Sequence, residues 1–266
     1  MPAGSSRSDT GRESHHVLVE RGDGTRSILI QREERRNALD ASMRQELIRA
    51  LSEPVAEGEF ATIIRSTGTV FCSGLDLTER LRAGTPQGES PIVDILRAID
   101  SHPLPTIAVV QGHAVAGGCE MALACDFVLA ANRANFSMPL VRLGLTPTWE
   151  LVVRLVETLG LSRTKAILLA AEPISAQALA EAHLIYRAVD SDELPRALED
   201  LLAALAKSVL GATSVTKAMI TRAASGRMAL PHGDLDRLAD EIRVGDEARR
   251  RVAVALAGKG DGRGRN

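Results

Sequence analysis

The sequence is poor in aromatic side chains and in cysteine. Only 2% of its 266 residues are Phe, Trp or Tyr, which argues against the aromatic surfaces on which nucleic-acid bases or quaternary ammonium groups stack. The three cysteines, Cys72, Cys119 and Cys125, form no CxxC pair. An odd and sparse set favours a reduced compartment over a disulfide framework. Since 45% of the residues are hydrophobic, we expect a large aliphatic core.

Clustered positive charge and an uninterrupted apolar span are also missing. The net charge is -2, with no basic block outside the two ends, so a nucleic-acid surface is not expected. The most apolar run, residues 114–131, contains Glu120 and Asp126 and has no basic or aromatic anchors. It is therefore interpreted as core and not as a membrane span. The first residues lack the apolar stretch of a secretory signal, and we expect a cytoplasmic protein.

Hydrophobic periodicity predicts strands and helices that alternate, followed by a helical end, which is the pattern of an α/β protein. The predicted core spans residues 15–200 and a helical C-terminal region spans 201–257; residues 1–14 and 258–266 are predicted to be disordered tails. The predicted strands are 17–20 and 26–31, which form a hairpin, and 60–66, 105–112, 126–131, 134–138 and 184–189. The predicted helices follow Asp40 as far as Pro54, begin at Ser90-Pro91 and end at Asp100, and run from Trp149 to Gly160, with a mobile loop over 82–90.

Two glycine-containing turns, each soon after a predicted strand, carry the candidate chemistry. One is "FCSGLDL" (71–77) and the other is "AVAGGCEMALACD" (114–126). Glycine lets a ligand approach the main chain closely, and free N–H groups at a helix N-terminus suit an anion or a developing oxyanion. Glu120 is a lone carboxylate in the second stretch, so it either caps the helix or does chemistry. The sequence does not show whether the two turns meet in space.

Four segments together resemble the enoyl-CoA hydratase/isomerase, or crotonase, family. They are "LIQREERRNALDASMRQEL" (29–47), "VFCSGLDL" (70–77), "VQGHAVAGGCEMALACDFVLAA" (110–131) and "FSMPLVRLGLTP" (136–147). They follow one another in the family's order and spacing, and the resemblance covers about residues 17–225. It implies a crotonase-like spiral of ββα turns with a helical C-terminal portion. The resemblance also implies that this portion, residues 201–257, serves oligomerisation, as a trimer or a dimer of trimers.

The resemblance also implies an acyl-CoA thioester as substrate, with coenzyme A as part of the substrate and no other cofactor and no metal. The backbone N–H groups of Leu75 and Gly117 would form an oxyanion hole for the thioester oxygen, and Glu120 would act as the acid or base. We expect a set of neighbouring residues to contact the substrate: Ser73, Gly74, Asp76, His113, Gly118, Leu140, Trp149 and Lys217.

The sequence departs from the family pattern at one position. Hydratases of the family carry a second Glu twenty residues after the first, and this chain has Leu140 there. Hydration needs an activated water and a proton for the neighbouring carbon, which two acids share. The resemblance therefore favours an enzyme with Glu120 as its single acid/base, and the alternative is an acyl-CoA-binding protein without turnover. Glu150, Asp76 and His113 stay open as substitutes for the missing acid.

Several candidates also have a purely structural interpretation. Asp76 more often closes a turn than acts as a base, and His113 is somewhat more often a structural histidine. Ser73 with His102 or His113 suggests a nucleophile pair, but no GxSxG motif surrounds the serine.

Overall fold

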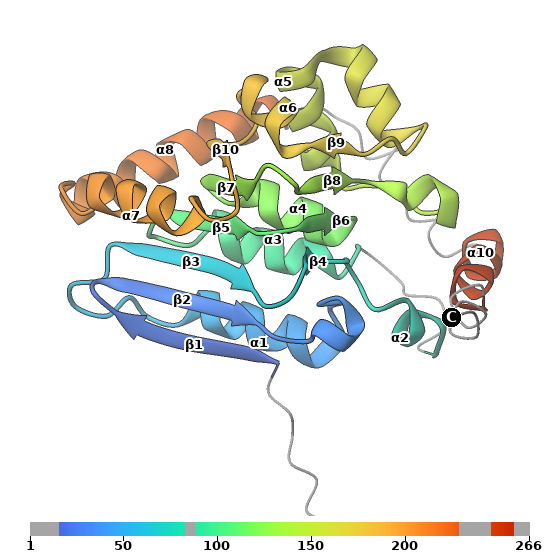
Figure 1. Ribbon diagram of the computed structural model, residues 1–266, viewed down its shortest axis with the longest axis horizontal. Helices are drawn as coiled ribbons and strands as arrows, with labels where there is room; N and C mark the ends of the chain where they lie inside the picture. Colours follow the sequence, from blue (N-terminus) through green and yellow to red (C-terminus); the bar gives the residue numbers. More distant parts are fainter. Residues whose placement is uncertain (1–15, 83–88, 229–245, 258–266) are drawn as a thin grey trace, which may run out of the picture.

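The computed structural model describes residues 16–82, 89–228 and 246–257 (Figure 1). Within these ranges the chain forms two sheets. Strand order in the six-stranded sheet is β1-β2-β3-β5-β7-β10, and in the four-stranded sheet it is β4-β6-β8-β9. The first sheet comprises β1 (Val17–Gly22), β2 (Thr25–Ile30), β3 (Ala61–Ser66), β5 (Thr106–Val110), β7 (Phe127–Ala131) and β10 (Arg187–Val189). The second comprises β4 (Val70–Cys72), β6 (His113–Val115), β8 (Asn135–Ser137) and β9 (Ile174–Ser175).

Each turn of the chain contributes one strand to each sheet and then a helix or a 3-10 helix. The pairs β3–β4, β5–β6 and β7–β8 repeat this step, and their neighbours pair in parallel. This is the predicted spiral of ββα turns in an α/β fold. The helical elements are η1 (Glu33–Arg35), α1 (Ala41–Ser52), α2 (Leu77–Arg82), α3 (Ile92–Asp100), α4 (Gly117–Ala124), η2 (Pro139–Leu143), α5 (Trp149–Leu168), α6 (Ala176–Glu181), α7 (Leu194–Leu205), α8 (Leu210–Met228) and α10 (Asp246–Ala257).

The inner strands β3, β5 and β7 of the six-stranded sheet are apolar on both faces, and helices cover both. Ile64, Ala108 and Val128 point into the main core, which they share with α1, α3 and α4. The alternate side chains Ile63, Ile107 and Leu129 pack against α7 in a smaller cluster. Strands that are buried on both faces have nearly continuous hydrophobic sequences. The segments "ATIIRS" and "TIAVV" can therefore be identified as strands from the sequence.

Most predicted elements are confirmed, with shifted ends. The hairpin forms between β1 and β2, and Asp40 caps α1 by accepting a hydrogen bond from the Met43 N–H at 3.0 Å. Gly160 interrupts α5 with φ 73° and ψ 170°, after which a second helical stretch continues. Helix α2 and the short strands β4, β6 and β9 were not predicted from the sequence.

The predicted Ser90 cap of α3 is wrong. Pro91 occupies the cap position in helical geometry, and no side chain caps this helix. The turn begins instead with the Ser90 carbonyl, which accepts the Val93 N–H at 2.9 Å. The predicted tails lie outside the described residues, and so does 83–88 of the predicted mobile loop.

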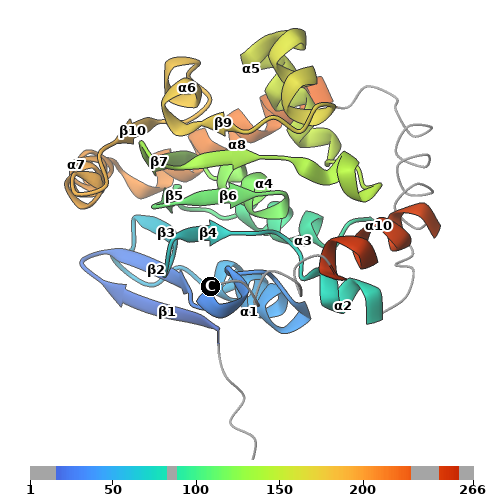
Figure 2. The ribbon, with the colours of Figure 1, turned by 45° about the vertical axis from the view of Figure 1, so that its right-hand side comes forward.

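The C-terminal region is helical where it is described. Helix α10 packs against α2 and η2, and Figure 2 shows it beside α2. Within the described ranges, no helix combines the length and the apolar character needed to cross a membrane.

Candidate active site

The parallel pairing of β4 with β6 brings the two glycine-containing turns together. Val70 pairs with His113 and Cys72 with Ala114, so both turns leave the same end of the small sheet. A Cβ added to Gly74 would stand 3.0 Å from the backbone nitrogen of Gly117. Glycine is therefore required at position 74, where φ is +86° as well. The question that the sequence left open is answered, since the turns meet in space.

The turn after β4 is held from one side by Leu39. The Leu39 N–H donates to the Gly74 carbonyl at 2.8 Å, and the Leu39 carbonyl accepts the Asp76 N–H at 2.9 Å. Leu39 and Leu75 thus form an isolated parallel bridge. In an extended chain successive N–H groups point to opposite sides, so the N–H of Leu75 points away from Leu39. Among the described residues it has no hydrogen-bond acceptor.

The turn after β6 carries strain at Ala116, which adopts φ 50° and ψ −123°. An L-residue in such a conformation costs about 1–3 kcal/mol and is tolerated only where its surroundings enforce it. Here the Ala116 N–H donates to the Ser137 carbonyl at 2.9 Å, and its own carbonyl accepts the Glu120 N–H at 3.0 Å. The strained residue leads directly into Gly117, the first residue of α4, where N–H groups lack helical partners.

Gly118 is needed for close packing. A Cβ at this position would lie 2.3 Å from the Cys72 carbonyl oxygen, so only glycine lets α4 begin directly against β4. Burial raises the pKa of the Cys72 thiol to about 12, which makes this cysteine a core residue and not a nucleophile.

Glu120 is buried in the first turn of α4, with 4% of its surface exposed. Its Oε1 accepts the Thr148 N–H at 2.8 Å, and Thr148 is the cap residue of α5. Glu120 therefore belongs to the first turn of α4, and its carboxylate contacts the N-terminal end of α5. Partial positive charge at helix N-termini stabilises an anion, which explains how an acid is accommodated in an otherwise apolar segment.

A small cavity of about 30 Å³ lies along α4, with room for about one water molecule. Glu120 lines it, as do Glu150 and Arg154 of α5 and Asp100 at the end of α3. Desolvation raises the pKa of Asp100, although Arg154 opposes this effect. Glu150, one of the open substitutes for the missing acid, therefore shares this cavity with Glu120.

Leu140 lies in η2, half-buried and packed against the main core. Its side chain holds no proton, and its carbonyl accepts the N–H of Leu145 at 2.9 Å. Trp149, the first residue of α5, is half-buried next to Thr148.

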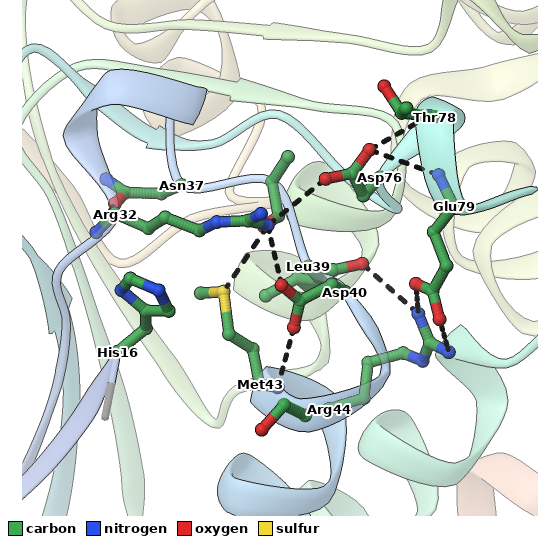
Figure 3. Close-up of polar contacts among 12 residues, drawn as sticks. His16, Arg32, Asn37, Leu39, Asp40, Met43, Arg44, Asp76, Thr78 and Glu79 are labelled. Carbon is green, nitrogen blue, oxygen red and sulfur yellow. Dashed lines mark hydrogen bonds and ion pairs between the residues drawn. The ribbon is translucent and has the colours of Figure 1, made fainter. Parts of the chain in front are cut away.

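The other predicted substrate contacts have different surroundings. Asp76 is engaged in capping α2 and in an ion pair with Arg32 (Figure 3). His113 is exposed on β6, and Ser73 donates its backbone N–H to the Arg36 carbonyl at 3.2 Å.

Lys217 lies in the protein interior with 8% of its surface exposed. Its Nζ donates to the carbonyls of Ile99 and Leu104, at 3.3 Å and 3.0 Å, and forms an ion pair with Asp126 at 2.7 Å. These contacts attach α8 to the core, and the contact of Lys217 with substrate stays a prediction.

His102 is a structural histidine. Its Nδ1 lies 2.8 Å from the Leu51 carbonyl and its Nε2 2.8 Å from the Thr62 hydroxyl. Because a carbonyl only accepts, Nδ1 carries the proton and Nε2 accepts from Thr62. Burial lowers the pKa of His102 to about 4, and both ring nitrogens are occupied, so this residue forms no pair with Ser73.

Sequence reasoning missed Arg32, Leu39 and Thr148. The first two lie in "QREERRNALD", where a run of charges resembles a solvated surface. Thr148 directly precedes a predicted helix, which is the one signal that marks it as a cap.

Two glycine-containing turns that meet, and a buried carboxylate in the first turn of the helix that begins at one of them, define a class of site. Such a site suits an enzyme that stabilises negative charge on a carbonyl oxygen while an acid or base moves a proton nearby. Comparison with known proteins then gives the family. The family model described as "Enoyl-CoA hydratase/isomerase" matches residues 20–243, and the chain belongs to this family.

Individual relatives agree with this assignment. An enoyl-CoA hydratase of Alternaria alternata is 33% identical over 245 residues, which cover 88% of this chain and 80% of that protein. A probable enoyl-CoA hydratase of Rhodobacter capsulatus is 38% identical, over 66% of this chain and 69% of its own. The solved structure of an enoyl-CoA hydratase/isomerase from Xanthobacter autotrophicus superposes with a TM-score of 0.77 at 28% identity, covering 95% of this chain and 99% of that one.

Proposed function

We propose that this protein is an enzyme acting on acyl-CoA thioesters, in which the N–H groups of Leu75 and Gly117 bind the thioester oxygen. The single observation that carries the proposal is the contact between the turns at Gly74 and Gly117. Two donors converging from separate strand ends form an oxyanion hole when they lie about 2.7–3.1 Å from the oxygen that gains charge. The names of the relatives support a thioester substrate.

Glu120 is the proposed acid/base. As a carboxylate it removes a proton from the carbon next to the thioester carbonyl, and the electron pair moves onto the oxygen held by the two N–H groups. The protonated Glu120 then returns the proton to the same carbon or to a neighbouring one. Enolate formation and double-bond movement follow this scheme. In elimination of a 3-hydroxyl group, the protonated Glu120 instead gives its proton to the departing oxygen, the C–O bond breaks as the enolate collapses, and the group leaves as water.

Hydration by a pair of acids is not part of the proposal, because Leu140 supplies no proton. Leu140 also supports a second candidate function. An acyl-CoA-binding protein without turnover would have no use for a second acid, and Leu140 would contact the acyl chain. The buried Glu120 favours the enzyme, since burying a carboxylate that does no chemistry is costly.

One experiment separates the two functions. Calorimetry would measure binding of saturated and 2-unsaturated acyl-CoAs, and mass spectrometry would follow the same thioesters for products and for deuterium uptake from heavy water at the carbon next to the carbonyl. We expect binding together with deuterium uptake. Tight binding without exchange or product over the whole panel would establish the binding protein instead.

A homo-oligomer, most simply a trimer, is part of this proposal. Helix α8 exposes Val215, Met219 and Ile220, each with more than 60% of its surface accessible. Such a set of apolar side chains on one helix is typical of a protein interface. Analytical ultracentrifugation of the full chain tests it, and a monomer at micromolar concentration would contradict it.

A further inference from the structure

Arg32 lies where the loop after β2 approaches both α1 and α2 (Figure 3). Its Nη1 donates to the Ala38 carbonyl at 2.9 Å and lies 3.0 Å from Asp40 Oδ2 and 3.2 Å from Asp76 Oδ2. Only 14% of the side chain is exposed. One guanidinium group therefore joins two carboxylates that are 36 residues apart in the sequence.

Each of these carboxylates also begins a helix. Asp40 Oδ1 accepts the Met43 N–H at 3.0 Å at the start of α1. Asp76 Oδ1 accepts the Thr78 N–H at 2.9 Å and the Glu79 N–H at 3.4 Å at the start of α2. Arg32 thus fixes the N-terminal ends of both helices relative to each other.

Arg32 connects two residues, and each of them comes immediately after one member of the Leu39–Leu75 bridge. Asp40 follows Leu39, and Asp76 follows Leu75. The bridge itself consists of two backbone hydrogen bonds on either side of Leu75. The geometry of this bridge decides where the Leu75 N–H points. Arg32 joins the next residues of the two segments, Asp40 and Asp76, through their side chains, so that the backbone bridge and the ion pairs form one closed ring of contacts at Leu75.

The ion pair with Arg32 requires Asp76 to be ionised, and the surroundings of Asp76 favour the ionised form. Burial by itself would raise the pKa of Asp76, but the N–H groups of Thr78 and Glu79 together with the Arg32 charge outweigh this effect and lower it. Asp76 is therefore a carboxylate at neutral pH, and its two oxygens are divided between the helix cap and Arg32.

We propose that Arg32 is a positioning residue for the oxyanion hole, which holds the Leu75 N–H in place through Asp76 and the Leu39 bridge. This inference rests on the proposed function of Leu75 as an oxyanion donor. Loss of Arg32 weakens stabilisation of the enolate much more than it weakens binding of the CoA portion, because a displaced donor loses its alignment while the rest of the pocket is kept.

The chain provides a matched control in a second connection between the same helices. Arg44 of α1 pairs with Glu79 of α2 at 3.0 Å (Figure 3). This pair ties α1 to α2. Arg44 Nη1 also donates to the Leu39 carbonyl at 3.2 Å, whereas the Glu79 side chain has no hydrogen bond to Asp76 or to the Leu39–Leu75 bridge among the described residues. Glu79→Gln therefore removes the ion pair between the helices, while it keeps the Arg44 bond to Leu39 and both ion pairs of Arg32.

The test uses acetoacetyl-CoA, a thioester whose enolate has its own ultraviolet absorption. The ratio of bound enolate to bound keto form is measured at fixed pH for the wild-type protein, Arg32→Met and Glu79→Gln. Binding of S-butyl-CoA, a thioether without a carbonyl, is measured by calorimetry on the same samples. We expect the enolate ratio to fall by about tenfold or more in Arg32→Met, and by less than about twofold in Glu79→Gln. The dissociation constant of the thioether should change less than about twofold in both.

The outcomes separate this inference from the proposed function. A wild-type protein that binds S-butyl-CoA without enriching the enolate overturns the oxyanion hole, and the inference with it. An enolate ratio that is strong in the wild type and unchanged in Arg32→Met overturns the inference alone. Equal losses in Arg32→Met and Glu79→Gln also overturn it, because any tie between the helices would then suffice.

If Arg32→Met does not fold, Asp76→Asn tests the same inference. Asparagine still caps α2 through its carbonyl oxygen but loses the ion pair with Arg32. A reduced enolate ratio with an unchanged thioether affinity is expected, and an unchanged ratio contradicts the inference. Partial rescue by Arg32→Lys is expected too, since lysine restores the charge but not the planar group that reaches two carboxylates.

Discussion

The backbone of Gly74 lies directly against the N–H of Gly117, so close that a Cβ on Gly74 would stand 3.0 Å from that nitrogen. Forty-three positions separate the two residues in the chain, and the parallel pairing of β4 and β6 brings them together. The arrangement leaves the N–H groups of Leu75 and Gly117 at one end of the small sheet, and the helix that begins at Gly117 carries the buried Glu120 in its first turn. The following predictions test each part of it.

Glu120→Gln should lower turnover by about 10²–10⁴-fold, which is the usual contribution of a positioned acid or base. Glutamine keeps an oxygen that can accept the Thr148 N–H, so the fold and the thioester affinity should be nearly unchanged. Product formation and calorimetric binding with one acyl-CoA measure the two effects. Glu120→Ala should lose the same activity and also some stability. Unaltered turnover in either variant would refute the assigned role.

Leu75→Pro should lower enolate formation by about 10²–10³-fold, because proline has no N–H to donate. The bridge with Leu39 uses the Gly74 carbonyl and the Asp76 N–H, so the substitution spares both of its hydrogen bonds. Leu75→Ala is the control, since it shortens the side chain and keeps the donor. Rates of hydrogen exchange into a bound thioester, measured beside a thermal unfolding curve, distinguish a lost donor from a lost fold. Similar rates for the two variants would mean that the Leu75 N–H does not act on the substrate.

Leu140→Glu should introduce hydration of a 2-enoyl-CoA if the pocket keeps the family's geometry. The new carboxylate would stand at the position of the acid that hydratases of the family use. Liquid chromatography of the products would detect the 3-hydroxyacyl thioester, and Leu140→Gln is the matched control without an acid. Because Leu140 is half-buried against the core, unfolding should be measured in parallel. A folded Leu140→Glu protein that binds thioesters but yields no 3-hydroxyacyl product would contradict the expected geometry.

Gly118→Ala should destabilise the protein by about 1–3 kcal/mol, the usual cost of overpacking a core. The added methyl group would lie 2.3 Å from the Cys72 carbonyl oxygen, and backbone cannot move aside as easily as a side chain. Gly211→Ala is the opposite case, since a Cβ there meets nothing within 4 Å. In α8 that change should stabilise the protein by about 0.5–1 kcal/mol. Urea unfolding of both variants measures the difference, and equal effects would contradict the packing at Gly118.

His102 should make the protein less stable as the pH falls from 6.5 to 4. Burial lowers its pKa from 6.5 to about 4 in the folded state, so between these values the unfolded chain binds a proton that the folded chain does not. Unfolding is then favoured as pH falls, by about 3 kcal/mol when the pH reaches the folded-state pKa. Comparing urea unfolding of the wild type and His102→Gln from pH 7 to pH 4 isolates this contribution. Parallel curves for the two proteins would show that His102 does not titrate as expected.

The sequence by itself determined much of the secondary structure and the identity of the chemical groups. Strands β2, β3, β5 and β7 are apolar runs because they are buried on one or both faces, and α1 is recognisable from Asp40 and its hydrophobic spacing. The family motifs led to Glu120, Leu75 and Gly117 because each lies within a distinctive local pattern. Short strands such as β4, with three residues, carry too little pattern to be seen this way.

Only the tertiary structure decided which of these groups meet. Pairing of β4 with β6 is a contact between distant segments, and no local propensity encodes its register. The positive charge of Lys217 does not by itself indicate a partner, and the tertiary structure shows that its ammonium group forms an ion pair with Asp126. Arg32 sits in a run of charges typical of a surface, yet packing turned its guanidinium group inward to Asp40 and Asp76. The sequence determines which chemical groups a residue carries, whereas the groups that it contacts depend on how the whole chain folds.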